Sequence, residues 1–182
     1  MKKIIDGEDL RAVMRHVPSP VTVVTAVRGD AARGVTIGSF TSVSLNPPLI
    51  SFNIEKAAQM HGFLHGATRF NVHVLANDQA HLSAHFALPD MTSEAQFEAV
   101  AYDLDAHGLP VLRDVLAVLT CTPYAFHEAG DHSLVLGHVH EVAVDDSKEP
   151  LLYFNRAYMS VGDAVKLRSL LTPMNRLSSE SP

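Results

Sequence analysis

The stretch GVTIGSFTSVSLNPPLISFNI, residues Gly34 to Ile54, decides the fold class. Its first part, Gly34 to Phe40, is typical of a strand, and its glycines allow the backbone to bend or to approach another group closely. Asn46-Pro47-Pro48 then interrupts the chain. The run after it alternates, with one apolar face formed by Ile50, Phe52 and Ile54 and one polar face formed by Ser51, Asn53 and Glu55. The stretch therefore predicts two strands separated by a proline break.

The β pattern continues on both sides of this stretch. Further runs of apolar and β-branched residues predict strands at Val21–Arg28, Arg69–Leu75, Val115–Phe126, Ser133–Val144 and Leu151–Met159. In the Arg69–Leu75 run, Phe70, Val72 and Val74 point inward and Asn71 and His73 point the other way. Gly137 lies within a strand whose apolar phase is irregular, which indicates a bulge or a barrel corner.

Helical patterns are few and short. Apolar residues at i, i+3, i+4 and i+7 predict a helix over Gly7–Val17, which Pro18 and Pro20 end. Two more short helices are expected at Ala57–His65 and at Asp78–Phe86, with Asp78 as the N-cap of the latter. The least regular stretch, Pro89–His107, is expected to run over the surface.

Seven strands with three short helices do not alternate as a doubly wound parallel sheet requires, and no Gly-x-Gly-x-x-Gly motif follows a strand. Antiparallel strands broken by prolines and glycines favour a mainly β fold, a small closed or partly closed barrel with helices packed outside. We expect one domain over residues 1–165 and a polar, partly disordered tail over residues 166–182.

Composition excludes several classes of function. Of 182 residues, 47% are apolar and 19% charged, a globular mixture, and the net charge is −6 with only 14 Lys and Arg. We therefore expect no nucleic-acid partner and no membrane surface as partner. No apolar stretch is long enough for a membrane helix, and the N-terminus lacks a signal-peptide pattern. The single cysteine, Cys121, is expected to be a buried small hydrophobe in a cytoplasmic protein.

Eleven histidines raise the question of a metal site. Two pairs have helical spacing, His61 with His65 and His81 with His85, but neither carries the zincin glutamate and no third ligand can be assigned. His138 and His140 can share one face of a strand, and a solvent-facing polar edge is the simpler interpretation. No Gly-x-Ser-x-Gly elbow supports a hydrolase, and no metal is expected. The paired carboxylates Asp103 with Asp105 and Asp145 with Asp146 lie in turn-like stretches and are interpreted as solvated.

Small hydroxyl residues are dense in the opening stretch: Thr36, Ser39, Thr41, Ser42 and Ser44. Such residues let a backbone approach a flat polar ligand while hydroxyl and amide groups bond its ring carbonyls and nitrogens. A hydroxyl-rich barrel strand without a ligand has the same composition. From the residues alone both interpretations stand.

Five collinear motifs resemble the short-chain flavin reductase family, the reductase components of two-component flavin monooxygenases. They are GVTIGSFTSVSLNPPLISFNI, RFNVHVLANDQAHLSAHFA, GLPVLRDVLAVLTC, GDHSLVLGHV and PLLYFNRAY, and they cover most of residues 10 to 160. The resemblance implies an antiparallel, Greek-key-like split β-barrel that forms a homodimer. It also implies reduction of FMN or FAD by NADH or NADPH and transfer of the reduced flavin to a partner flavin-dependent monooxygenase.

The resemblance also implies site residues. The isoalloxazine ring would be lined by Thr36, Ile37, Gly38 and Ser39 and by Ser42, Val43 and Ser44. The ribityl chain and phosphate would lie near Asn53 and the following Lys56, Ala57, Ala58 and Gln59. Phe86 would close the pocket, and Tyr158 is a further cofactor contact. His132, which the Gly130-Asp131 turn orients, would face the nicotinamide as the catalytic-site residue, in a positioning or electrostatic role.

This chain departs from the family pattern at three places. Ala57, Ala58 and Gln59 stand where the family often carries Ser or Thr, so two phosphate hydroxyls are missing. His73 replaces a usual Asn, and an aromatic-rich segment is reduced to Gln96–Asp105. A non-enzymatic flavin- or haem-binding protein on the same barrel is the alternative, and a plain interaction module is the third.

Overall fold

The computed structural model describes residues 4–163. Four helices lie in this range: α1 (Gly7–Met14), α2 (Gln59–Gly66), α3 (Ala80–Phe86) and α4 (Ser93–Glu98). The first strands are β1 (Ser19–Pro20), β2 (Thr22–Arg28), β3 (Ala31–Ile37), β4 (Thr41–Leu45), β5 (Pro48–Glu55) and β6 (Phe70–Val74). The later strands are β7 (Tyr102–Leu104), β8 (Pro110–Leu112), β9 (Ala117–Ala129), β10 (His132–Val144), β11 (Leu152–Phe154) and β12 (Ala157–Met159). The mainly β prediction is confirmed, whereas the polar tail of residues 166–182 lies outside the described residues.

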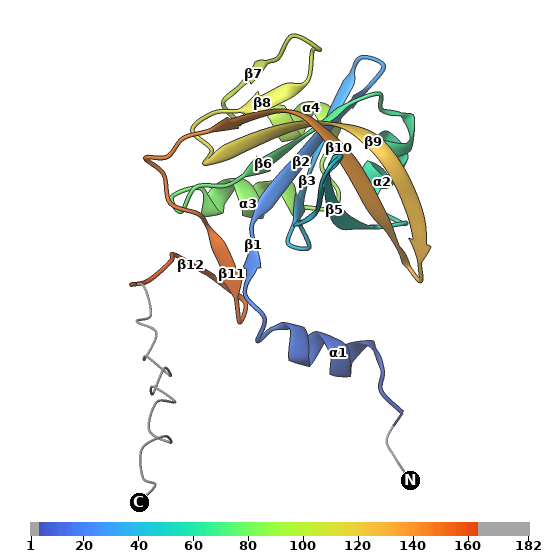
Figure 1. Ribbon diagram of the computed structural model, residues 1–182, viewed down its shortest axis with the longest axis vertical. Helices are drawn as coiled ribbons and strands as arrows, with labels where there is room; N and C mark the ends of the chain where they lie inside the picture. The colour runs from blue at the N-terminus through green and yellow to red at the C-terminus, as the bar shows by residue number, and fades with distance from the viewer. Residues whose placement is uncertain (1–3, 164–182) are drawn as a thin grey trace, which may run out of the picture.

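A strongly curved antiparallel sheet forms the body of the molecule (Figure 1). Its seven strands follow the order β3-β2-β6-β9-β10-β5-β4, so β3 and β4 are the two edges. The sheet curls until β3 approaches β5, yet these two strands share no ladder of hydrogen bonds. We call this opening, between Val35–Ser39 and Asn53–Glu55, the seam, and we call the paired strands β6, β9 and β10 the wall. The split barrel that the family resemblance implies is therefore confirmed.

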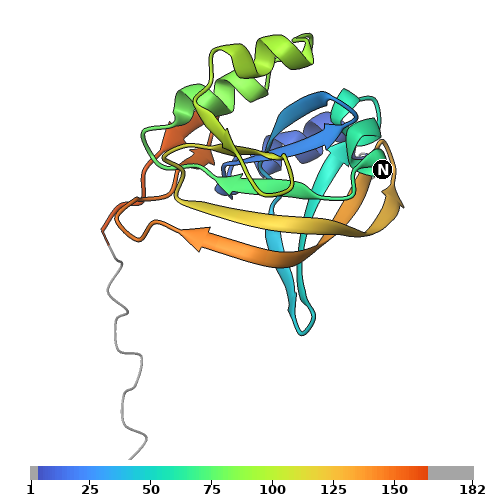
Figure 2. The same ribbon diagram turned by 90° about the horizontal axis from the view of Figure 1, so that it is seen from above.

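Two apolar clusters lie on the two faces of the sheet. The inner cluster includes Phe52, Phe70 and Val135, and α2 closes it with Met60 and Leu64. The outer cluster joins β2 to α3, α4 and β8, and Figure 2 shows both helices on one side of the sheet. Since both faces of β2 and β6 are covered, Asn71 and His73 are fully buried, although they point away from the inner cluster as the alternation predicts.

Two local predictions are wrong. Asp78 does not cap α3, because the N-cap is Gln79 and no side chain caps this helix. The stretch Pro89–His107 is not merely a surface excursion, because it contains α4 and β7, and Gln96 and Phe97 of α4 are buried. Both elements are too short for a periodic pattern to show in the sequence. Packing of Gln96 and Phe97 holds α4 in place, and pairing with β8 holds β7.

Two glycines serve identifiable purposes. Gly130 adopts φ 65° in the two-residue turn between β9 and β10. Gly137 lies at a register irregularity between β9 and β10, where an added Cβ would come within 2.6 Å of the Phe70 Cζ atom. The bulge predicted at Gly137 is confirmed, and the close approach of the Phe70 ring leaves no room for a side chain at this position.

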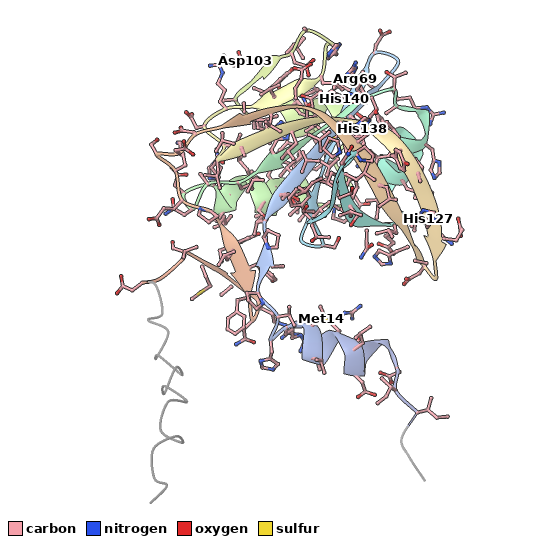
Figure 3. The ribbon with its side chains drawn as sticks, in the orientation of Figure 1. Met14, Arg69, Asp103, His127, His138 and His140 are labelled. Atoms are coloured by element: carbon pink, nitrogen blue, oxygen red, sulfur yellow. The ribbon has the colours of Figure 1, made fainter. Side chains whose placement is uncertain are left out.

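Two apolar segments stand out from the barrel. Helix α1 has no buried residue, and Figure 3 shows its Met14 away from the sheet. The hairpin of β4 and β5 extends beyond the body (Figure 2) and exposes Val43 by 50% and Leu45 by 89%. No helix among residues 4–163 is long and apolar enough to span a membrane.

Candidate functional site

A cavity of about 600 Å³ occupies the seam, a volume within the range of small-molecule sites. One side is the end of β3 with the residues after it, and the other side is the end of β5. The turn between β9 and β10 forms the rim. The lining residues are Val35, Thr36, Ile37, Gly38, Ser39, Asn53, Ile54, Glu55, Ala58, Ala129 and His132. Seven of them are among the residues predicted from the sequence: Thr36–Ser39, Asn53, Ala58 and His132.

Strand β3 presents unpaired peptide groups to the seam because it is an edge strand. Gly34 directs both its N–H and its C=O away from β2, where they bond the buried amide of Gln96 at 3.1 and 3.2 Å. Alternate residues of an antiparallel strand point their peptide groups the same way. Thr36 therefore turns its N–H and C=O toward the opening, a donor and an acceptor for the edge of a flat heterocycle.

Hydroxyl groups connect the two sides of the seam to each other and to α3. The Ser39 hydroxyl accepts a hydrogen bond of 2.9 Å from the Asn53 N–H, which joins the two sides. The Thr36 hydroxyl donates to the Ser83 carbonyl of α3 at 2.7 Å. Tyr158 of β12 donates to the Ser83 hydroxyl at 2.9 Å. Tyr158 thus lies behind Thr36 and supports the seam from outside, and it does not line the cavity.

His132 reaches the cavity from the first position of β10. The carboxylate of Asp131 lies 2.8 Å from the His132 Nδ1 atom. A carboxylate only accepts, so Nδ1 carries the proton and Nε2 is the nitrogen left for another partner. The hydrogen bond from His132 lowers the pKa of Asp131. The turn thus sets both the position and the tautomer of the imidazole.

A second cavity of about 360 Å³ adjoins the first and shares Val35, Glu55 and Ala58 with it. It lies between β3, the start of α2 and the residues after α3. Ala57, Ala58, Gln59 and Phe86, all predicted site residues, line it. Gly34 permits the close packing of Phe86, since a Cβ there would lie 2.5 Å from the Phe86 ring.

The remaining predicted residues lie elsewhere in this monomer. Ser42, Val43 and Ser44 belong to the protruding β4, which pairs with Pro48–Ser51 of β5 and lines neither cavity. The Lys56 ammonium forms an ion pair with the exposed Glu128 of β9, and this pair lowers the pKa of Glu128. Lys56 lines neither of the two cavities.

Sequence reasoning missed Glu55, Arg33 and Gln96. Glu55 lines both cavities and is opposite His132 in the strand ladder. Its place two residues after Asn53, on the same strand face, was a usable signal. Arg33 and Gln96 line the second cavity, but they meet only through packing of α4 on β3, which no local pattern shows.

The paired histidines contact other side chains of the protein. Within residues 4–163 no group of three metal-ligating side chains is present. His61 bonds the Ser133 hydroxyl at 3.0 Å, and His65 stacks on Phe126, so both attach α2 to the hairpin that carries His132. Desolvation lowers the pKa of His61. His138 and His140 share the outer face of β10, as predicted, with ring centroids 4.5 Å apart (Figure 3).

Two further predictions concern single residues. Cys121 is buried, as predicted, and burial raises the pKa of its thiol to about 12. Asp103 is not simply solvated, since it forms a two-bond ion pair with Arg113. Asp105 is partly buried, where it accepts from Asn71 and from the backbone of its own loop.

Comparison with known proteins gives a consistent result. Residues 14–162 match the family model described as a flavin reductase like domain. A flavin reductase of Pseudomonas putida is 35% identical over 159 residues, 87% of this chain and 92% of that protein. The reductase component of 4-hydroxyphenylacetate 3-monooxygenase from Thermus thermophilus is 34% identical over 151 residues, 83% of this chain and 94% of that protein.

A solved structure agrees with these sequence matches. The NADH:FAD oxidoreductase SgcE6 of Streptomyces globisporus, in complex with NAD and FAD fragments, superposes with a TM-score of 0.82 at 34% identity. The match covers 91% of this chain and all of that one.

Proposed function

Because the chain belongs to the flavin reductase family, we propose that the seam is the place where its flavin and its nicotinamide donor meet. The chain is an NAD(P)H:flavin oxidoreductase that reduces FMN or FAD and supplies reduced flavin to a partner monooxygenase. The residues of the seam fit a flavin ring: small side chains allow close approach, and the free peptide groups of Thr36 match ring carbonyls and nitrogens.

When bound, flavin and nicotinamide supply the hydride chemistry themselves, and the protein contributes orientation and exclusion of water. Thr36–Ser39 and Asn53 would hold the ring edge. The Nε2 of His132, which Asp131 does not engage, would bond the carboxamide of the nicotinamide. The hydrogen bond between Asp131 and Nδ1 fixes the orientation of the ring and leaves Nε2 for the nicotinamide. His132 is therefore a positioning residue in this proposal.

The observation that carries this proposal is an edge strand with free peptide groups facing a histidine of fixed tautomer across one cavity. The test is to follow nicotinamide absorbance with purified protein, NADH, and either FMN, FAD or no flavin. We expect oxidation of NADH that depends on added flavin. An equal rate with and without flavin would contradict the proposal.

We further propose NADH as the preferred donor. The related enzyme from Streptomyces globisporus is named an NADH:FAD oxidoreductase. In this chain Glu55 is opposite His132 in the strand ladder, the Asp131 carboxylate bonds the Nδ1 atom of His132, and the nearby Lys56 is already paired with Glu128. Such a rim disfavours an added 2′-phosphate. The ratio of kcat/KM for NADH to that for NADPH measures this preference, and a ratio below one would contradict it.

We propose that the functional unit is a homodimer. Large apolar side chains are exposed on α1, on the β4–β5 hairpin and on β11 and β12, and such concentration favours an interface. In a dimer, the second copy's β4 could bring Ser42, Val43 and Ser44 to the seam, which would reconcile their predicted role with their position. Sedimentation equilibrium tests this, with a monomer as the contradicting result.

We place the enzyme in the cytoplasm. Its one thiol, Cys121, is buried and cannot form an intrachain disulfide, as is usual for proteins of a reducing compartment. Cell fractionation with an antibody against the chain tests this location, and recovery outside the cytoplasmic fraction would contradict it.

A further inference from the structure

Arg33 is a buried cation in the second cavity. It lies in β3 directly before Gly34, is 5% exposed, and lines the cavity opposite the start of α2. One of its N–H groups donates to the Met91 carbonyl at 3.1 Å. Among the described residues, no carboxylate lies within ion-pair distance of its guanidinium.

A buried guanidinium without an anion is costly. Desolvation lowers the pKa of Arg33, and no opposing carboxylate charge raises it. Removing a charge from water is strongly unfavourable unless a partner of opposite charge compensates it. The remaining N–H donors of the planar fork suit an anion with several oxygens, such as a phosphate.

The start of α2 offers a second favourable element in the same cavity. The eight-residue helix begins at Gln59, and no side chain caps it. Its first N–H groups and its dipole favour negative charge. Lys56, by contrast, lines neither cavity and is engaged by Glu128.

We propose that Arg33, together with the first turn of α2, binds the phosphate of the flavin nucleotide in place of Lys56. This proposal rests on the proposed function, because it takes the ring to lie in the adjoining seam. Arg33 would supply the contacts that the missing hydroxyls at Ala57, Ala58 and Gln59 do not.

Two carboxylates of the second cavity limit where the phosphate can lie. Glu55 and Asp90 also line it and would repel an anion placed against them. Neither forms an ion pair with Arg33 in the described range. They are acceptors for hydroxyl groups, so they suit the ribityl chain, and the phosphate belongs on the Arg33 side.

The test compares riboflavin, which lacks the phosphate, with FMN and FAD. Quenching of flavin fluorescence gives the dissociation constant of each without any turnover. The wild-type protein should bind FMN more tightly than riboflavin. Arg33→Met should weaken FMN binding by roughly tenfold to a hundredfold, the range of a charge-assisted contact, and leave riboflavin binding nearly unchanged.

Arg28→Met is the matched control, since Arg28 lies beside Gly62 and Gly66 of α2 but lines neither cavity. It should keep the wild-type ratio of riboflavin to FMN dissociation constants. If Arg33→Met does not fold, Arg33→Lys is measured the same way. Its ratio of riboflavin to FMN dissociation constants should also fall, because the planar guanidinium is lost, but by a smaller factor, because the positive charge remains. A wild-type ratio in either folded Arg33 variant overturns the proposal.

The controls separate this proposal from other outcomes. An unchanged FMN constant with a raised KM for NADH in Arg33→Met would assign Arg33 to the pyridine nucleotide and overturn the proposal. Failure of the proposed function is seen separately, as absence of flavin-dependent NADH oxidation by the wild-type protein. FAD binding shows whether a diphosphate is held by the same residue.

Discussion

In the wall, Asn71 and His73 of β6 are fully buried and each bonds protein oxygens through one nitrogen, whereas at the seam Thr36 and Asn53 face a cavity. Both pairs belong to one curved sheet. The difference follows from strand order, since β6 has a neighbour on each side and an outer cover from β8, while β3 has only β2. Polar groups of the wall therefore serve stability, and those of the seam remain for ligands. Substitutions in the wall should therefore change stability, and substitutions in the seam should change nucleotide binding.

The largest effect is expected from protonation of His73. Burial lowers its pKa from 6.5 to about 4, although its Nδ1 donates to the Val23 carbonyl. The folded state therefore binds its proton more weakly than the unfolded state. The stability that neutral His73 contributes is fully present above pH ~6.5. The free energy of unfolding should fall by up to ~3 kcal/mol as the pH drops to about 4.

The control for this prediction is His73→Asn, which has no titrating group. Urea unfolding at several pH values measures the difference between the two proteins. Their pH dependences should diverge below pH ~6.5, with the wild type losing more. Parallel curves would show that His73 is not held neutral in the wall.

Gly137→Ala tests the packing of the wall. The new Cβ would meet the buried Phe70 Cζ at 2.6 Å and Ile50 Cδ1 at 3.0 Å. We expect a loss of about 2 kcal/mol, typical of overpacking, while kcat of the folded fraction stays unchanged. Gly7→Ala meets no atom within 4 Å and is the control. A loss no larger than in the control would refute close packing at this position.

His132→Ala tests the seam. Loss of the nicotinamide contact should raise the KM for NADH about tenfold, or ~1.4 kcal/mol, without lowering Tm. His127→Ala is the control, because His127 is exposed on the same hairpin and lines neither cavity (Figure 3). A lowered Tm with unchanged kinetics would make His132 part of the scaffold.

Asp131→Asn should have the smallest effect. An amide can donate to Nδ1 and so favour the wrong tautomer of His132. Because Asp131 is solvent-exposed, the expected rise in KM for NADH is roughly twofold to fivefold. Asp131→Glu keeps the acceptor and should restore the KM at least partly. Equal kinetics of Asp131→Asn and the wild type would show that Asp131 does not set the tautomer of His132.

Local patterns were sufficient for much of the wall and for one side of the seam. Alternation located β5, and Gly130-Asp131 located the turn before His132. The family resemblance then selected Thr36–Ser39. What failed depends on distant parts of the chain: Arg33 is a ligand candidate only because of the start of α2, and Gln96 is buried only because α4 packs on β3.

The position of Ser42–Ser44 shows a different limit of sequence reasoning. Their hydroxyl-rich pattern is the same whether a strand lines a pocket or projects from the body. Only the pairing of β4 with β5 and the end of that ladder at Ser51 separate the two cases.

A crystal structure of the protein grown with FMN tests the central claim most directly. We predict the flavin ring in the seam, with its edge against the Thr36 peptide and the Asn53 side, His132 across the ring, and the phosphate within hydrogen-bond distance of Arg33. A flavin bound at any other surface, with the seam filled only by solvent, would contradict the account.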